Sequence, residues 1–219
     1  MQTGLDKAHF AATSAFRVDV ALVLAVDCSS SVDAGDFRMQ MDGIAAALRN
    51  PPFAGAIAAG PHGRIALSLV QWSSRRRQAI TMNWRLLTGR PALEMAARDI
   101  EKAERNWDPG GTGIAAAIEF SIGHLQNFAF LADRRVIDVS GDGEESEGGD
   151  AATARDRAKG RGITINGLPI ISGSNRLESY YRRNVVGGPG AFVIPAKDMR
   201  SFGDAMARKL LREVASATA

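Results

Sequence analysis

The pattern of apolar and polar positions begins with a continuous apolar run, Val20–Val26, which is rich in valine and leucine. Such a run is typical of a strand buried on both faces, and we expect this strand to cover about residues 18–26. The run ends abruptly in a carboxylate and a cluster of serines. Asp27, Ser29 and Ser31 alternate with other residues, so a tight loop leaving the strand can turn their side chains toward one point.

Downstream, helical and strand-like patterns alternate to the end of the chain. Apolar residues spaced three and four apart predict helices that begin near Phe37, Leu93, Ile114, Ala151, Leu177 and Met199. Short apolar runs predict further strands over residues 64–72, 77–84, 134–140, 163–171 and 191–194. The second and third strands are separated by a four-residue connection that is common in hairpins, so we expect them to pair antiparallel.

Turn-forming residues set the expected boundaries of the helices. Asp33 or a nearby residue is expected to cap the first helix, and Asn50-Pro51-Pro52 to end it. The stretch Pro51–Gly63 is then predicted to be a loop with at most a short helical turn. Thr88 is expected to cap the next helix, which carries Pro91 in its first turn.

This alternation predicts an α/β fold class: a doubly wound, mostly parallel six-stranded sheet with one antiparallel edge strand and helices on both faces. We assign residues 17–217 to a single domain and residues 1–16 to a leader or edge segment. The chain has 219 residues, of which 45% are hydrophobic and 23% are charged. That is an ordinary globular composition, long enough to bury a core without covalent staples.

Composition and charge exclude several classes of protein. The single cysteine, Cys28, rules out an internal disulfide and a multi-cysteine zinc site. A formal net charge of +3 gives no case for nucleic acid as a partner, and no apolar stretch is long enough to be a transmembrane segment. Residues 1–16 do not form a complete signal peptide, so the sequence leaves the compartment open.

Two further loops are punctuated by glycine. The loop over residues 108–113 places Thr112 directly before a helix, and Gly141-Asp142-Gly143 follows the strand at 134–140. In open α/β sheets, ligands bind where the carboxyl ends of the strands meet at one edge. We therefore expect Thr112 and Asp142 to lie beside the loop that starts at Asp27, with the glycines permitting positive φ values and close backbone approach.

Together these loops offer five candidate metal ligands, namely Asp27, Ser29, Ser31, Thr112 and Asp142. All five are oxygen ligands, and such a set suits Mg²⁺, Ca²⁺ or Mn²⁺ and argues against zinc. The two carboxylates balance the charge of a divalent ion without excess, so the ion stays electrophilic. A site with so few anionic ligands leaves a coordination position for an acidic group from outside.

The order and spacing of these residues resemble the von Willebrand factor A (vWA) domain, and the resemblance covers about residues 17–217. It implies a Rossmann-like sheet in which the five positions form a metal-ion-dependent adhesion site (MIDAS). The serines and Thr112 would bind Mg²⁺, or alternatively Mn²⁺ or Ca²⁺, directly. Asp27 and Asp142 would act directly or through water, and a Glu or Asp of a protein partner would complete the coordination sphere.

The resemblance is greatest to a group of uncharacterised bacterial vWA-like proteins that are often exported, which implies an exported or periplasmic location. The sequence departs from the family pattern at two positions. Cys28 is an unusual residue within the motif, and Gly141 stands where many relatives have threonine. Neither departure removes a ligand.

These side chains also have purely structural explanations. The serines after Asp27 can cap the following helix, and Thr112 can cap the helix that it precedes. Cys28 is expected to be a small buried residue, and Arg75–Arg77 a solvated hairpin tip. The acidic residues within 144–150 are expected to be solvated, with a second calcium site there as the alternative. The three histidines share no metal-binding spacing.

The leading functional hypothesis is a metal-ion-dependent protein-binding module that is not an enzyme, because the oxygen ligands lack a positioned nucleophile or general base. The alternative is a magnesium-dependent phosphatase of the haloacid dehalogenase type, which the loops at Asp27 and Gly141–Gly143 also resemble. That class needs an Asp as general acid where this chain has Ser29, and a lysine between the two loops that is not evident here. A third possibility is a scaffold whose site never loads with metal.

Overall fold

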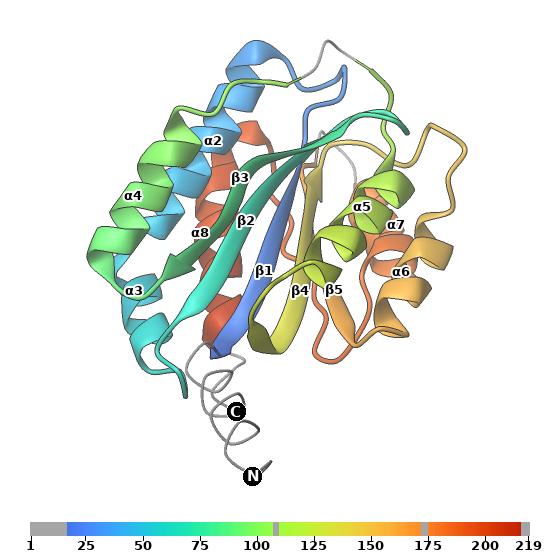
Figure 1. Ribbon diagram of the computed structural model, residues 1–219. Helices are drawn as coiled ribbons and strands as arrows, with labels where there is room; N and C mark the ends of the chain where they lie inside the picture. Colours follow the sequence, from blue (N-terminus) through green and yellow to red (C-terminus); the bar gives the residue numbers. More distant parts are fainter. Residues whose placement is uncertain (1–16, 107–109, 172–174, 216–219) are drawn as a thin grey trace, which may run out of the picture.

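The computed structural model describes residues 17–106, 110–171 and 175–215, and its centre is a single sheet (Figure 1). The strands are Arg17–Asp27 (β1), Ile65–Trp72 (β2), Gln78–Leu87 (β3), Leu131–Gly141 (β4) and Ile163–Pro169 (β5). They lie in the order β3-β2-β1-β4-β5. The central strand β1 is parallel to β2 and β4, β5 is parallel to β4, and β3 is antiparallel to β2 at the edge.

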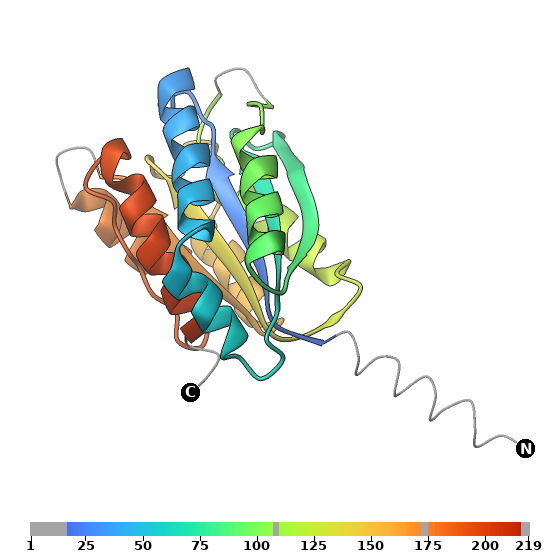
Figure 2. The ribbon, with the colours of Figure 1, turned by 90° about the vertical axis from the view of Figure 1, so that its left-hand side faces the viewer.

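Helices cover both faces of the sheet. One face carries Ala34–Leu48 (α2), Pro51–Ala58 (α3), Arg90–Glu101 (α4) and Phe202–Ala215 (α8), which Figure 2 shows side by side. The other face carries Ile114–Gln126 (α5), Ala151–Lys159 (α6) and Arg176–Tyr180 (α7). A π-helical turn, Tyr181–Val185 (η1), follows α7, and a 3₁₀ turn, Met199–Ser201 (η2), precedes α8. The predicted α/β fold class is confirmed, including its antiparallel edge strand.

The central strand explains why the sheet has two cores. Leu22, Leu24 and Val26 pack into the core beneath α2 and α8, while the alternate residues Ala21 and Val23 pack into the core beneath α5. All of these side chains are fully buried. The continuous apolar run therefore predicted a doubly buried strand correctly, since both faces of β1 need apolar side chains.

The predicted sixth strand is wrong. Residues 191–194 approach the free edge of β5 only through isolated bridges, in which Val193 pairs with Gly167 and Ala196 pairs with Ile170. The backbone N–H groups of Ile194 and Ala196 donate to the carbonyls of Gly167 and Pro169, so an N–H at residue 195 would point away from β5. Pro169 of β5 has no backbone N–H and cannot donate the bond between these two, which interrupts a regular ladder. The sheet therefore has five strands within the described residues.

The prediction of a loop over residues 51–63 is also wrong at its start, where α3 forms an eight-residue helix. Pro51 and Pro52 occupy the first positions of α3, where a missing N–H breaks no helical hydrogen bond. Phe53 and Ile57, one turn apart, are buried against the core. The Asn50-Pro51-Pro52 sequence thus ends one helix and begins the next.

The N-cap residue is the one predicted from the sequence in one helix and a different residue in two others. The Asp33 side chain accepts from the Asp36 backbone N–H at 2.8 Å and caps α2, as predicted. The N-cap of α4 is Gly89 rather than Thr88, and the N-cap of α5 is Gly113 rather than Thr112. Neither glycine has a side chain that can accept a capping hydrogen bond.

A buried ionic network fixes α8 to the sheet. The Lys209 ammonium pairs with Asp138 of β4 and lies 3.5 Å from Glu213. Asn166 of β5 donates its side-chain N–H to Glu213 at 2.6 Å. All four side chains are fully or almost fully buried. Because a charge buried without its partner is costly, the network ties α8 to the side of the sheet that carries β4 and β5.

The contact between α2 and α8 depends on two glycines. A Cβ atom added to Gly43 would lie 2.9 Å from the Cα of Gly203 and 3.1 Å from the Phe202 ring. By contrast, a Cβ atom added to Gly123 within α5 would have no neighbour within 4 Å. Both positions are helical, so the same substitution at each changes helix propensity alike but changes packing only at Gly43.

We therefore predict opposite effects for the same substitution at the two positions. Gly43→Ala should destabilise the protein by about 1–2 kcal/mol, because overpacking outweighs the better helix propensity of alanine. Gly123→Ala should stabilise it by roughly 0.5–1 kcal/mol through propensity alone. Urea unfolding measures both values, and a shift of both variants in the same direction would contradict the close helix contact.

Candidate metal centre

The candidate ligands lie at the carboxyl edge of the parallel strands, as the topology predicts. β1 and β4 are neighbours in register, with Val26 opposite Ser140. Asp27, the last residue of β1, therefore lies beside Gly141, and Asp142 follows directly. The sheet itself brings the two carboxylates, which are far apart in sequence, to the same place.

Four of the five candidate ligands form one connected cluster. The Ser31 hydroxyl donates to Asp142 Oδ1 at 2.5 Å, and the hydroxyl oxygens of Ser29 and Ser31 lie 3.3 Å apart. The backbone N–H of Ser29 donates to Asp27 Oδ1 at 2.7 Å. Cys28 and Ser30 are spacers, since Cys28 is buried and Ser30 is exposed.

Thr112, the fifth candidate, is held beside the same cluster. Its backbone N–H donates to the Ser146 hydroxyl and its carbonyl accepts from the Ser146 N–H, both at 2.9 Å. Its hydroxyl oxygen lies close to Gly143, where an added Cβ would approach it to 3.2 Å. The carbonyl of Gly110 also accepts from the Ser30 N–H at 2.8 Å, so the three loops are tied together. Asp108 and Pro109 of the predicted loop lie outside the described residues.

Three supporting residues were not predicted from the sequence. The Arg105 guanidinium donates to the carbonyls of Cys28 and Ser29 at 2.7 and 2.8 Å. Gln40 donates its side-chain N–H to the Asp27 carbonyl at 3.1 Å, and Glu145 accepts from the backbone N–H of Ala115, the second residue of α5, at 2.8 Å. Arg105 belongs to no motif or periodic pattern that could have revealed it in the sequence. Gln40 could have been noticed as a polar residue on the buried side of α2.

The glycines of the site serve close approach rather than unusual backbone conformation. Gly111, Gly113, Gly141 and Gly143 are all outside the positive-φ region, so that part of the prediction is wrong. A Cβ atom on Gly111 would lie 1.8 Å from the Glu147 carboxylate, and one on Gly141 would lie 2.8 Å from Asp27 Oδ2. Close packing therefore leaves little room for a side chain at Gly113 and Gly141, whereas at Gly111 the end of the Glu147 side chain would have to move.

The Asp27 carboxylate carries the electrostatic signature of the site. Burial raises its pKa from 3.8 to about 7, opposed by the hydrogen bond from the Ser29 backbone N–H, and the nearby Asp142 raises it further. Its Oδ2 atom is buried and has no hydrogen bond of good geometry, although the Ser29 hydroxyl and the Asp142 backbone N–H lie close enough to the carboxylate to lower its pKa. An unpaired carboxylate oxygen is costly in the interior unless a cation compensates for it. The donor set of two carboxylates and three hydroxyls fits a hard divalent cation.

Helix capping does not account for the hydroxyl side chains. Asp33 caps α2, so the three serines are not needed for that purpose. Gly113 is the N-cap of α5, and the side chain that accepts a backbone N–H of the first turn belongs to Glu145, not to Thr112. The structural alternative that competed with a metal site is therefore removed for Ser29, Ser31 and Thr112.

A second group with metal-binding side chains, Asp19, His62 and Asp133, lies at the opposite edge of the sheet. Its carboxylates already have partners. Asp19 accepts from the backbone N–H groups of His62 and Arg64 at 2.8 and 3.2 Å, and Asp133 pairs with Arg17 at 2.7 Å. These bonds hold the loop that precedes β2 against the sheet, which gives the three residues a structural role.

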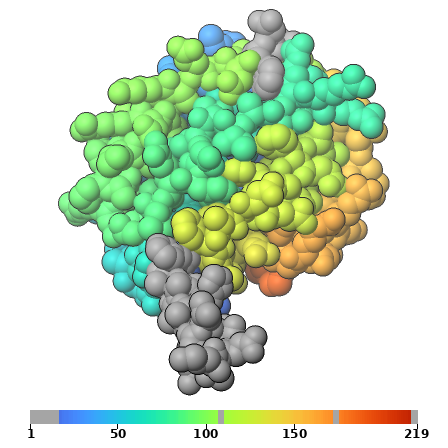
Figure 3. All heavy atoms as spheres, viewed as in Figure 1, coloured from blue at the N-terminus to red at the C-terminus, as the bar shows by residue number. Residues whose placement is uncertain are grey.

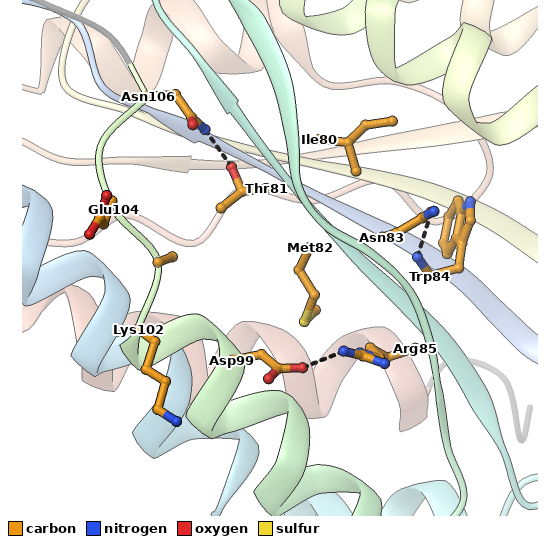
Figure 4. A pocket seen from close by; sticks show the side chains of 11 residues that line it. Ile80, Thr81, Met82, Asn83, Trp84, Arg85, Asp99, Lys102, Glu104 and Asn106 are labelled. Carbon is orange, nitrogen blue, oxygen red and sulfur yellow. Dashed lines mark hydrogen bonds and ion pairs between the residues drawn. The ribbon is translucent and has the colours of Figure 1, made fainter.

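A hollow of the described surface also lies away from the candidate ligands. It has a volume of about 590 Å³ and lies between the exposed edge strand β3 and the end of α4 (Figure 4); Figure 3 shows the surface of these two elements. Arg85 pairs with Asp99 at 2.8 Å, and Asn106 donates to Thr81 at 2.9 Å. These polar groups satisfy one another, so the hollow does not present a cluster of free ligands like the one around Asp27.

Comparison with known proteins gives a family and a fold. A family model described as "Protein of unknown function (DUF1194)" matches residues 17–218. No curated protein matches the chain in sequence. Within the described residues, no helix has the length and apolar character needed to cross a membrane.

Among solved structures, the chain is similar to proximal thread matrix protein 1 from the mussel byssus, described with a zinc-occupied MIDAS motif (TM-score 0.65, 13% identity, 90% of this chain and 46% of that chain). It is also similar to a von Willebrand factor type A protein from Catenulispora acidiphila (0.61, 15%, 92% and 43%). A third similar structure is an aerotolerance-related membrane protein from Bacteroides fragilis (0.53, 18%, 88% and 99%). The chain spans less than half the length of the first two proteins, and these identities show the fold alone.

The buried carboxylate predicts a specific dependence of stability on pH. In excess EDTA, the free energy of unfolding should fall as the pH rises from about 4 to about 7, because the folded protein keeps a proton on Asp27 that the unfolded chain releases near pH 3.8. In Asp27→Asn, the loss of unfolding free energy between pH 4 and pH 7 should be smaller than in the wild type by roughly 2–4 kcal/mol. Urea unfolding at several pH values measures the slope.

Two controls make the result specific. Burial also raises the pKa of Asp138, so some pH dependence should remain in the Asp27→Asn variant. Asp150→Asn changes an exposed carboxylate and leaves an asparagine that can still cap α6, so it should keep the wild-type slope. An unchanged slope in Asp27→Asn would contradict the burial of an unpaired carboxylate.

Proposed function

Because the chain belongs to the family described as DUF1194 and has the fold of a vWA domain, we propose that it is a metal-ion-dependent protein-binding module with a MIDAS-type site. The observation that carries this proposal is the buried, unpaired Oδ2 of Asp27 among the hydroxyl groups of neighbouring loops. A bound cation would satisfy this oxygen and the surrounding hydroxyl groups together.

The ligand chemistry favours Mg²⁺, with Mn²⁺ or Ca²⁺ as alternatives. Ser29, Ser31 and Thr112 would hold the ion directly, and Asp27 and Asp142 would do so directly or through water. All of these are hard oxygen ligands, which magnesium prefers and which lack the nitrogen or sulfur typical of zinc sites. The mussel protein is described with zinc in its MIDAS motif, so a titration needs to include zinc for comparison.

The exposure of the ligands indicates the side from which a partner approaches. Asp27 and Ser29 are fully buried and form the floor of the site. Ser31 is exposed and Asp142 is partly exposed, so they form the rim. Two carboxylates neutralise a divalent ion without reversing its charge, so the ion would still attract an anion. The partner is therefore a protein that offers a Glu or Asp side chain from the solvent side.

The same residues argue against catalysis. Cys28 lies within the motif, but burial raises the pKa of its thiol to about 12, and its Sγ–H donates to the Trp72 carbonyl at 3.2 Å. A protonated, buried thiol is not reactive at neutral pH. His124 is stacked on Trp84 and hydrogen-bonded to Ser68 of β2, away from the cluster. These observations support a binding module that is not an enzyme.

An exported or periplasmic location completes the proposal. The Bacteroides fragilis protein that shares this fold is described as an aerotolerance-related membrane protein. Fractionation of the source cells would place the chain.

Metal binding is the direct test of this function. Isothermal titration should detect one Mg²⁺ or Mn²⁺ per chain, and both Asp27→Asn and Asp142→Asn should abolish the binding because each removes a carboxylate. At a metal concentration of about 100 times the dissociation constant, the wild-type protein should gain roughly 2.7 kcal/mol in its free energy of unfolding. The Asp150→Asn variant is the matched control and should bind like the wild type.

Wild-type protein that binds neither ion would overturn the metal site and leave the scaffold alternative. Equal binding by the wild type and by Asp27→Asn would place the ion elsewhere, with the Asp19, His62 and Asp133 group as the next candidate.

The phosphatase alternative makes the opposite prediction in an enzyme assay. Because Ser29 stands where a general acid is needed, the protein should not hydrolyse a chromogenic phosphate ester in the presence of Mg²⁺. Turnover that requires Mg²⁺ and disappears in Asp27→Asn would replace the binding proposal with the phosphatase. Turnover that persists in Asp27→Asn would indicate a contaminating enzyme.

A further inference from the structure

Tyr181 is a buried side chain that the proposed metal centre does not yet include. Its side chain is fully buried, and its hydroxyl has no hydrogen-bond partner. It is the first residue of η1, the π-helical turn that follows α7. π-Helical turns distort a helix and occur frequently at functional sites. A buried phenol without a partner at such a turn calls for a physical explanation.

Two glycines on neighbouring strands make room for this side chain. A Cβ atom on Gly167 of β5 would lie 2.8 Å from Tyr181 Cδ1. A Cβ atom on Gly141, at the end of β4, would lie 2.9 Å from the Tyr181 hydroxyl oxygen. The ring therefore crosses β5 at Gly167, and its hydroxyl reaches the end of β4. Any larger residue at either position would displace the tyrosine.

The hydroxyl ends beside the unpaired oxygen of the metal centre. The same added Cβ atom on Gly141 would lie 2.8 Å from Asp27 Oδ2. The position where a Cβ atom of residue 141 would lie is therefore close to both Asp27 Oδ2 and the Tyr181 hydroxyl. Both oxygens are buried and have no hydrogen-bond partner. Because residue 141 is a glycine, no side chain separates the two oxygens.

The two groups are chemically complementary. An ionised carboxylate only accepts hydrogen bonds, whereas a phenol can donate one. A tyrosine phenol keeps its proton at neutral pH, because its ordinary pKa is about 10. A donor and an acceptor that each lack a partner lie on the two sides of one glycine.

We propose that Tyr181 is a positioning residue of the metal centre, whose hydroxyl donates to Asp27 Oδ2 directly or through one water. This inference rests on the proposed function, because the orientation of Asp27 has consequences only if the site binds an ion. Oδ2 has two lone pairs, so it can accept this hydrogen bond and still bind the ion, while Oδ1 accepts from the Ser29 backbone N–H at 2.7 Å. Partners that orient metal ligands in this way typically change metal affinity by about 10–100-fold when they are removed.

A purely structural role makes a different prediction. The Tyr181 ring belongs to the core on the α5 and α6 side of the sheet, where a phenylalanine would fill the same space without the hydroxyl. If the tyrosine served only to pack, its replacement by phenylalanine would leave metal binding unchanged. The hydroxyl alone therefore separates the two roles.

The test compares Tyr181→Phe with Tyr180→Phe in the full chain. Tyr180 is the adjacent tyrosine, with ring centroids 6.4 Å apart, and its hydroxyl accepts from the Glu145 N–H at 3.4 Å rather than facing Asp27. Isothermal titration with Mg²⁺ and Mn²⁺ should show affinity reduced about 10–100-fold in Tyr181→Phe and changed less than about twofold in Tyr180→Phe. Circular dichroism and urea unfolding confirm that both variants are folded.

A double-mutant cycle gives a readout that does not require metal. In EDTA, the effects of Tyr181→Phe and Asp27→Asn on the free energy of unfolding should be non-additive, because the two side chains share one interaction. Additive effects together with wild-type metal affinity in Tyr181→Phe would overturn the inference while leaving the metal site intact. A wild-type protein that binds no metal would instead overturn the proposed function, and the role of Tyr181 with it.

Discussion

The burial of the Asp27 carboxylate at the end of the central strand is the constraint on which the site depends. Apolar side chains bury both faces of β1, so the residue that follows its apolar run lies deep in the molecule. Burial raises the pKa of this carboxyl to about 7, and the Ser29 backbone N–H satisfies only one of its two oxygens. The other oxygen is left for a cation or a donor from the protein. The strand that organises the fold therefore also creates the need for a ligand.

The loops around Asp27 are held by groups that are independent of any ligand. Arg105 fixes the carbonyls of Cys28 and Ser29, and Gln40 fixes the carbonyl of Asp27. Ser146 holds both backbone groups of Thr112. Ligand oxygens that are fixed in advance lose little freedom when an ion binds, which favours both affinity and selectivity. Tyr181 extends this support beneath the carboxylate, where two glycines leave room for it.

Sequence patterns predicted the features that follow from periodicity and topology. The apolar run of β1 and the helical spacing of α2 are local signals, and the convergence of Asp27, Thr112 and Asp142 follows from the parallel sheet. The residues that the sequence did not reveal act through contacts between distant segments. Arg105 reaches Cys28 across 77 positions of the chain, and Tyr181 is positioned by a π-helical turn that the helical pattern does not distinguish. The errors at α3 and at residues 191–194 both involve proline, which begins a helix in one case and interrupts a strand in the other.

The central claim is that these oxygens surround one divalent ion, and a crystal soaked in Mn²⁺ tests it most directly. We expect a single strong anomalous peak for an ion that is coordinated by the hydroxyl oxygens of Ser29 and Ser31 and lies next to Asp27. One coordination position of this ion should face solvent beside Asp142. The same soak of Asp27→Asn crystals should show no peak at this place. Wild-type crystals without a peak there, or with one only at Asp19, His62 and Asp133, would contradict the account.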